Sequence, residues 1–154
     1  MEFTQYIENC KRQIKKAKPT ATQEVIDWNA PFILTPEEPN QKGILLIHGL
    51  LDSCFSMRDI GKLFQKKGYW VYAVLLPGHG TKPADLCKVT VEDWLKTVDA
   101  GIQALRKRAS NISIAGHSTG AALALYYTGL QAKNSIKKIY GFAPACAIKS
   151  QYAC

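Results

Sequence analysis

The last third of the sequence contains no carboxylate. All 12 Asp and Glu residues lie at or before Asp99, whereas residues 100–154 contain seven Lys and Arg, so nearly all of the formal charge of +8 comes from this segment. Clustered basic residues bind nucleic acid or anionic membranes. The basic residues here are scattered, apart from runs at 11–18 and 106–108. We therefore expect neither a nucleic acid nor a membrane as a partner.

The sequence also lacks a long apolar run and a paired cysteine motif. No stretch reaches about 18 apolar residues, the length that crosses a membrane, and the N-terminus has no apolar signal-peptide core. The five cysteines are an odd number without C-x-x-C spacing, which argues against a disulfide framework and a zinc knuckle. We expect reduced thiols in a cytoplasmic protein.

The sequence does have enough apolar character for one packed core. Hydrophobic residues make up 47% of the 154, and aromatic residues 10%, which excludes a disordered chain. The N-terminal segment 1–20 predicts an amphipathic helix over 3–16, because Phe3, Ile7 and Ile14 recur at helical spacing. Either a membrane surface or the remaining domain, residues 21–154, would cover the apolar face of this helix.

Residues 44–142 alternate between apolar runs and helical patterns. Short unbroken apolar runs, typical of strands covered on both faces, occur at 44–47 and 69–76, and further strands are predicted at 112–115 and 136–142. Helical patterns lie between them, at 57–67, 90–108 and 119–130. Residues 24–34 are predicted to supply a strand or a hairpin. This order predicts an α/β fold with a mostly parallel sheet and flanking helices.

The motif Gly116-His117-Ser118-Thr119-Gly120 joins a predicted strand directly to a predicted helix. In this context G-x-S-x-G places the serine on a strained turn with its Oγ exposed above the sheet. Glycine at the two flanking positions lets the helix approach the neighbouring strands without a collision. We predict that Ser118 is a nucleophile. The alternative is a chance glycine-rich turn in which Ser118 only caps the helix.

A second motif, His48-Gly49-Leu50, follows the first predicted strand of the parallel sheet. An oxyanion hole needs two backbone donors, one at the N-terminus of the helix after the nucleophile and one from a neighbouring loop. We therefore predict that the donors are the N–H groups of Leu50 and Thr119.

At these motifs the sequence resembles the α/β-hydrolase superfamily, in particular the branch of bacterial carboxylesterases and monoglyceride lipases. The resemblance runs from about Gly43 to Pro144 and includes the turn 77–80. It implies hydrolysis of a carboxylic ester through an acyl-enzyme, in which Ser118 attacks, a histidine acts as base and then acid, and a carboxylate orients that histidine. It also implies a small-molecule ester substrate and no metal or organic cofactor.

The sequence departs from this family at the catalytic acid and base. The family order is serine, acid, histidine, but no Asp, Glu or His follows Ser118. We assign structural roles to His48, His79 and His117, and expect the His117 ring to point away from the Ser118 Oγ. The resemblance thus implies the N-terminal portion of the fold, truncated after the strand at 136–142, without the cap and the last strands.

Two functions remain open at this point. One is a serine esterase or lipase whose isolated chain is weakly active or inactive, because the triad acid and histidine are missing. The other is a non-catalytic binding module that kept the fold. We also expect the strand at 136–142 to leave an apolar sheet edge, only slightly blunted by Lys137 and Lys138, through which the chain self-associates.

Overall fold

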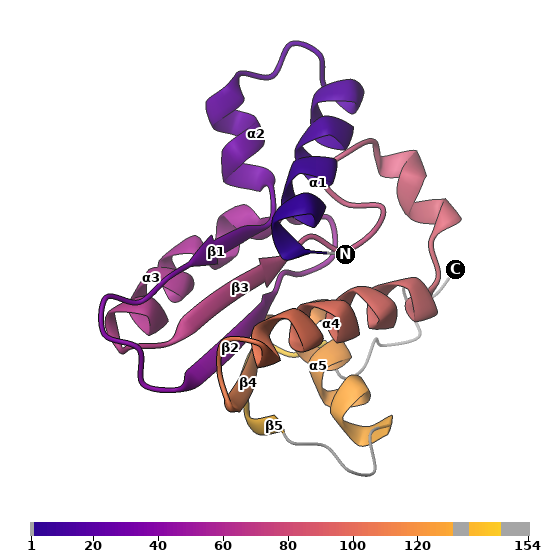
Figure 1. The fold of residues 1–154 in the computed structure, drawn as a ribbon. Coiled ribbons are helices and arrows are strands. Elements are labelled where there is room, and N and C mark those ends of the chain that lie inside the picture. Colours follow the sequence, from indigo (N-terminus) through magenta and orange to yellow (C-terminus); the bar gives the residue numbers. More distant parts are fainter. Residues whose placement is uncertain (1, 131–135, 146–154) are drawn as a thin grey trace.

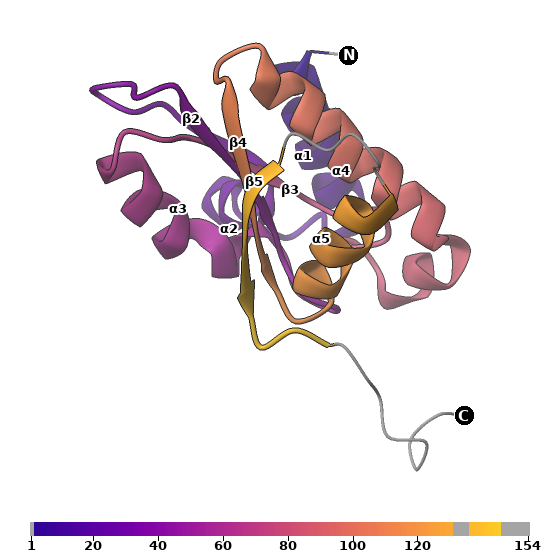
Figure 2. The ribbon, with the colours of Figure 1, turned by 90° about the horizontal axis from the view of Figure 1, so that it is seen from below.

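Five strands form one sheet with helices on both of its faces (Figures 1 and 2). The computed structural model describes residues 2–130 and 136–145. The strand order is β1-β3-β2-β4-β5, with β1 antiparallel to β3 and the other neighbours parallel. The elements are α1 (Phe3–Ala17), α2 (Gln23–Asn29), β1 (Phe32–Leu34), β2 (Lys42–Ile47), η1 (Cys54–Met57), α3 (Arg58–Lys66), β3 (Trp70–Val74), η2 (Pro83–Lys88), α4 (Val91–Arg106), β4 (Asn111–His117), α5 (Thr119–Leu130) and β5 (Ile136–Phe142). The predicted α/β class is confirmed.

The central strand β2 explains the unbroken apolar runs. Leu45 and Ile47 belong to the core cluster that includes residues of α4 and α5. Ile44 and Leu46 point to the opposite face, into the cluster that includes residues of η1 and α3. All four side chains are fully buried. Figure 2 shows the same division, with α3 on one side of the sheet and α4 and α5 on the other. A strand covered on both faces has no position left for a polar side chain.

The predicted alternation of strands and helices is confirmed from β2 onward. The start of α4 is fixed by a reciprocal cap, in which Thr90 Oγ1 accepts the Asp93 N–H at 3.3 Å and the Asp93 carboxylate accepts the Thr90 N–H at 3.1 Å. Such a cap satisfies two N–H groups that a helix start leaves without partners. The helical pattern expected from residue 90 therefore begins where the structure places the N-cap.

The prediction of a strand or hairpin over residues 24–34 is wrong for its first half. Residues 23–29 form the helix α2, and only Phe32–Leu34 form a strand. Thr22 caps α2 by accepting the Val25 N–H at 3.3 Å. Arg58, from α3, donates to the carbonyl groups of Asp27 and Trp28 at the other end of α2. This second contact spans about 30 residues of sequence, so no local pattern reveals it.

The apolar face of the N-terminal helix α1 packs on the rest of the domain, which was one of the two expected covers for it. Phe3 joins the core cluster on one face of the sheet, whereas Cys10 and Ile14 join the cluster on the other face. The Tyr6 hydroxyl donates to the Leu75 carbonyl at 2.7 Å and accepts the Leu75 N–H at 3.0 Å. This fixes α1 just beyond the end of β3 (Figure 1). Within the part of the chain described, no helix combines the length and apolar character needed to span a bilayer.

Three cysteines can be placed, and all three are free thiols. Cys10 and Cys54 are buried, and Cys87 is exposed. Burial raises the pKa of the Cys10 thiol to about 11. Cys146 and Cys154 lie outside the described residues.

Candidate active site

Ser118 lies at the junction of β4 and α5 in a backbone conformation that L residues rarely adopt. Its φ is +51°, in the left-handed region, which costs a non-glycine residue roughly 1–3 kcal/mol. The Ser118 N–H donates to the Phe142 carbonyl at the end of β5 at 2.8 Å, and the Ser118 carbonyl accepts the N–H groups of Ala121 and Ala122 in the first turn of α5. The strained turn is therefore held by the neighbouring strand and by the helix that it begins.

The two glycines around Ser118 are required by close backbone contacts. A β-carbon on Gly116 would lie 2.4 Å from the carbonyl carbon and oxygen of Gly120. A β-carbon on Gly120 would lie 2.4 Å from the carbonyl oxygens of Ile47 and His48. Real β-carbons do not approach backbone atoms this closely, so α5 can begin directly against the ends of β4 and β2 only with glycine at these positions.

The turn His48-Gly49-Leu50 lies against the same junction. His48 is fully buried, its Nε2 accepts the Leu76 N–H at 3.0 Å, and its Nδ1 therefore carries the proton toward the Gly49 carbonyl at 2.8 Å. Burial is the main cause that lowers the pKa of His48 to about 4. This histidine is neutral at neutral pH, and both ring nitrogens are used to hold the turn.

Gly49 and Leu50 continue this turn beside the serine. A β-carbon on Gly49 would lie 3.1 Å from His117 Nδ1 and 3.4 Å from Ser118 Cβ. Leu50 is half-exposed. Thr119 is the first residue of α5, and the N–H groups at a helix start have no partner within the helix. The structure thus brings all the residues of the two motifs to one point at the carboxyl edge of the sheet.

His79 lies in the turn after β3 and is buried. Its Nδ1 is 3.2 Å from the Pro77 carbonyl, and its ring centroid is 4.8 Å from that of His48 and 5.8 Å from that of Trp94. Its Nε2 is buried without a hydrogen-bond partner in the described part of the chain. Gly78 and Gly80, on either side, have φ values of +80° and +74°, so the turn itself needs glycine.

His117 is the one histidine of the three with an exposed ring. Its Nδ1 lies 4.0 Å from Asp52 Oδ2. Among residues 2–130 and 136–145, no hydrogen bond joins Ser118 to a histidine. Sequence reasoning did not single out Asp52. Its contact with His117 arises because β2 and β4 are adjacent, and the only local signal was a carboxylate two residues after Leu50.

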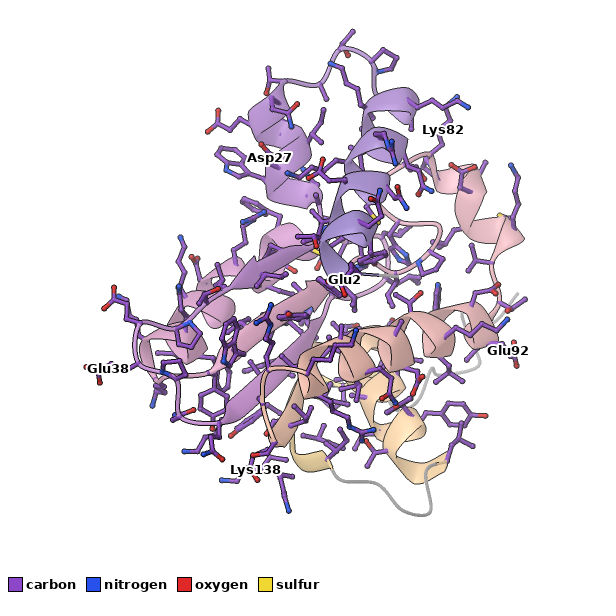
Figure 3. All side chains as sticks on the ribbon, in the orientation of Figure 1. Glu2, Asp27, Glu38, Lys82, Glu92 and Lys138 are labelled. Atoms are coloured by element: carbon purple, nitrogen blue, oxygen red, sulfur yellow. The ribbon has the colours of Figure 1, made fainter. Side chains whose placement is uncertain are left out.

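A hollow of about 650 Å³ opens beside these loops. It is lined by Lys18 and Asn29 near the ends of α1 and α2, by Leu51–Ser53 and Phe55, and by Gly78–Pro83 and Leu86. Lys82, which is labelled in Figure 3, is one of these lining residues and lies close to the end of α1. Ser118, Leu50 and Thr119 are not among its lining residues. Within the described ranges, no group of three or more His, Cys, Asp or Glu side chains is arranged to hold a metal ion.

The chain is similar in sequence to a bacterial lipase and a bacterial esterase. A thermostable monoacylglycerol lipase of Bacillus sp. (strain H-257) is 38% identical over 84 residues, which cover 54% of this chain and 34% of the lipase. A carboxylesterase of Bacillus subtilis (strain 168) is 31% identical over 129 residues, which cover 77% of this chain and 49% of the esterase. The chain thus spans half or less of the length of these relatives.

Solved structures of lipolytic enzymes also resemble the fold of this chain. A chain from the pair LipS and LipT, two metagenome-derived lipolytic enzymes, superposes with a TM-score of 0.71 at 29% identity, covering 78% of this chain and 47% of that one. The monoacylglycerol lipase of Paleococcus ferrophilus superposes with a TM-score of 0.64 at 26% identity, covering 76% and 43%. The sequence profile of the family described as serine aminopeptidase, S33, matches residues 38–154. The chain belongs to this family of α/β-hydrolases and is related to bacterial carboxylesterases and monoacylglycerol lipases.

Proposed function

We propose that this chain carries the nucleophile and the oxyanion-binding donors of a serine hydrolase that acts on carboxylic esters. The observation that carries the proposal is the left-handed φ of +51° at Ser118, a non-glycine residue between a strand and a helix. A strained serine at this junction is what the nucleophile of this fold requires. A residue that served only to cap the helix would have an extended conformation, as Thr22 and Thr90 do.

In the proposed reaction, the Ser118 Oγ attacks the ester carbonyl, the bond to the alcohol oxygen breaks, and the Ser118 proton passes through solvent to that oxygen as the alcohol leaves. Water then hydrolyses the acyl-enzyme to the acid and free Ser118. The N–H groups of Leu50 and Thr119 would stabilise the oxyanion of the tetrahedral intermediate. The tight packing of Gly49 against Ser118 and the position of Thr119 at the start of α5 support this assignment.

The described residues supply no hydrogen-bonded histidine that could accept the Ser118 proton. His48 uses both ring nitrogens in the fold, His79 lies in the turn after β3, and the His117 ring reaches toward Asp52. A serine hydroxyl without a base is a poor nucleophile, and the loss of triad members slows serine hydrolases by several orders of magnitude. We infer that acylation of Ser118 by this chain alone is slow, and that its remaining rate comes from the oxyanion donors.

The test is hydrolysis of p-nitrophenyl butyrate by the wild-type chain and by Ser118→Ala at equal concentration. The oxyanion donors remain in Ser118→Ala and contribute equally to both rates, so the difference between the two chains measures attack by the Ser118 Oγ. We expect the wild type to be faster. An aminoacyl p-nitroanilide, measured in parallel, separates ester from amide hydrolysis, since the family is described as an aminopeptidase. Equal rates for the wild type and Ser118→Ala would contradict the proposal and favour a non-catalytic binding module.

We also propose that β5 pairs with a second copy of the chain. It is the last strand in the sheet order and is bonded to β4 alone among the described strands. Phe142 on this strand is 40% exposed, and the neighbouring helix α5 exposes the apolar side chains of Leu125, Tyr126 and Leu130. An unpaired strand edge beside an apolar surface is a site for strand pairing between chains.

A further inference from the structure

The loop between β2 and η1, residues 48–53, has little regular structure to hold it in place. Leu51 has a φ of +57° and is 76% exposed. A branched residue in the left-handed region is strained, and an exposed side chain contributes no packing that would offset the strain. The position of Leu50 in this loop therefore depends on other contacts nearby.

Asp52 supplies those contacts from a single carboxylate. Its Oδ1 accepts the Ser53 N–H at 2.7 Å, and its Oδ2 accepts the Ser56 hydroxyl in η1 at 2.6 Å. Oδ2 is also 4.0 Å from Nδ1 of His117, the residue before Ser118. Asp52 is therefore bonded to the loop and to η1, and lies close to the turn that carries the serine.

A second set of contacts fastens the other side of the loop. The Ser53 hydroxyl donates to Asn29 Oδ1 at 2.6 Å and accepts the Phe55 N–H at 3.3 Å. Asn29 is the last residue of α2, and Arg58 holds the preceding carbonyl group of Trp28 at 3.0 Å. The loop is thus bonded to α2, an element that lies before the residues matched by the family profile.

We propose that Asp52 is a positioning residue, whose hydrogen bonds to Ser53 and Ser56 hold the loop so that the Leu50 N–H faces Ser118. The proposal rests on the proposed function, because the Leu50 N–H matters only if an oxyanion forms beside Ser118. Asp52 acts through the loop and not on the substrate. We assign this role to the hydrogen bonds of Asp52 and not to the interaction of its charge with His117.

The test compares three variants of the full chain. Asp52→Ala removes both acceptors. Asp52→Asn keeps a carbonyl oxygen for the Ser53 N–H, its NH2 group can donate to the Ser56 hydroxyl oxygen, and the negative charge is lost. Asp59→Asn is the control, because its side chain is 97% exposed on α3 and forms an ion pair with Lys62. Two quantities are measured: the rate at which a fluorophosphonate labels Ser118, and the backbone amide NMR shifts.

We expect Asp52→Ala to slow labelling by at least about tenfold, since losing an oxyanion donor costs about two to three orders of magnitude and a partial misplacement costs less. Its amide shifts should change at Leu50 and Ser53, and thermal unfolding in the same buffer shows whether the rest of the domain stays folded. Asp52→Asn should label within about threefold of the wild type and restore the Leu50 shift. Asp59→Asn should match the wild type in both measurements.

Two results would overturn the proposal. One is an Asp52→Ala chain with an unchanged Leu50 shift, and the other is an Asp52→Asn chain as slow as Asp52→Ala, which would assign the effect to the charge. The NMR measurement does not need activity. A wild-type chain that is never labelled would therefore count against the proposed function, while the Leu50 shift would still decide whether Asp52 positions the loop.

Discussion

Gly120 lies so close to Ile47 that a β-carbon on Gly120 would be 2.4 Å from the Ile47 carbonyl oxygen. The first turn of α5 therefore rests on the end of β2 with no intervening side chain. This contact brings the serine turn and the turn after β2 together, and it sets the geometry on which the proposed oxyanion site depends.

The first prediction concerns this contact. Gly120→Ala should lower the free energy of unfolding by about 3 kcal/mol or more, because the clash is with backbone that cannot move aside. Gly129→Ala in the same helix is the matched control, since a β-carbon there would meet nothing within 4 Å. It should be neutral or stabilise by up to about 1 kcal/mol. Urea unfolding of both variants measures the difference, and similar values for the two would show that α5 is not packed as described.

The second prediction concerns the strain at Ser118. Glycine adopts a positive φ at little steric cost, so Ser118→Gly should be more stable than Ser118→Ala by about 1 kcal/mol. Both variants lack the hydroxyl, so the comparison isolates the backbone term. Thermal or urea unfolding measures it. If Ser118→Ala were the more stable of the two, Ser118 would not have the left-handed conformation in solution.

The third prediction concerns His48. Its pKa is about 4 in the folded chain against 6.5 for the free side chain, so the unfolded chain binds a proton first as the pH falls. The stability linked to His48 is complete above pH 6.5 and is lost between pH 6.5 and 4, by about 3 kcal/mol in total. Urea unfolding at pH 7 and pH 4 should show this loss in the wild type.

His48→Gln should reduce that pH dependence, although the variant is less stable at both values. His117→Gln, at an exposed position, is the control and should keep the wild-type loss. NMR titration of the His48 ring provides an independent check, with an expected midpoint near the pKa of about 4. A midpoint close to 6.5 would mean that the ring is solvated and that the turn after β2 is not closed.

The fourth prediction concerns the edge of β5. If this strand pairs with a second copy, sedimentation velocity at increasing concentration should reveal a dimer. Phe142→Lys should weaken the dimer by about tenfold, because a charge on an edge strand opposes pairing. Leu63→Lys, at a position that is 55% exposed on α3, should leave it unchanged. A wild-type chain that stays monomeric at all concentrations would refute the pairing.

Much of the fold was predictable because its signals are local. The apolar run at 44–47 reflects burial on both faces of β2, and the cap at Thr90 is visible as Thr and Asp three residues apart. The glycines around Ser118 likewise predicted a close approach of helix and strands, which the contacts of Gly116 and Gly120 confirm.

The two misses depend on contacts that are distant in sequence. Residues 23–29 form a helix that is held at its end by Arg58, about 30 residues later. Asp52 and His117 approach each other only because β2 and β4 are neighbours in the sheet. A pattern within a short window contains neither the pairing of strands nor the identity of a distant partner.

Ser118 is tested most directly as the nucleophile by the site at which a fluorophosphonate reacts with the chain, determined by peptide mapping and mass spectrometry. We expect an adduct on Ser118, formed slowly, absent from Ser118→Ala and retained in Ser110→Ala. An adduct spread over several serines, or the same labelling in Ser118→Ala as in the wild type, would contradict the assignment of Ser118 as the nucleophile.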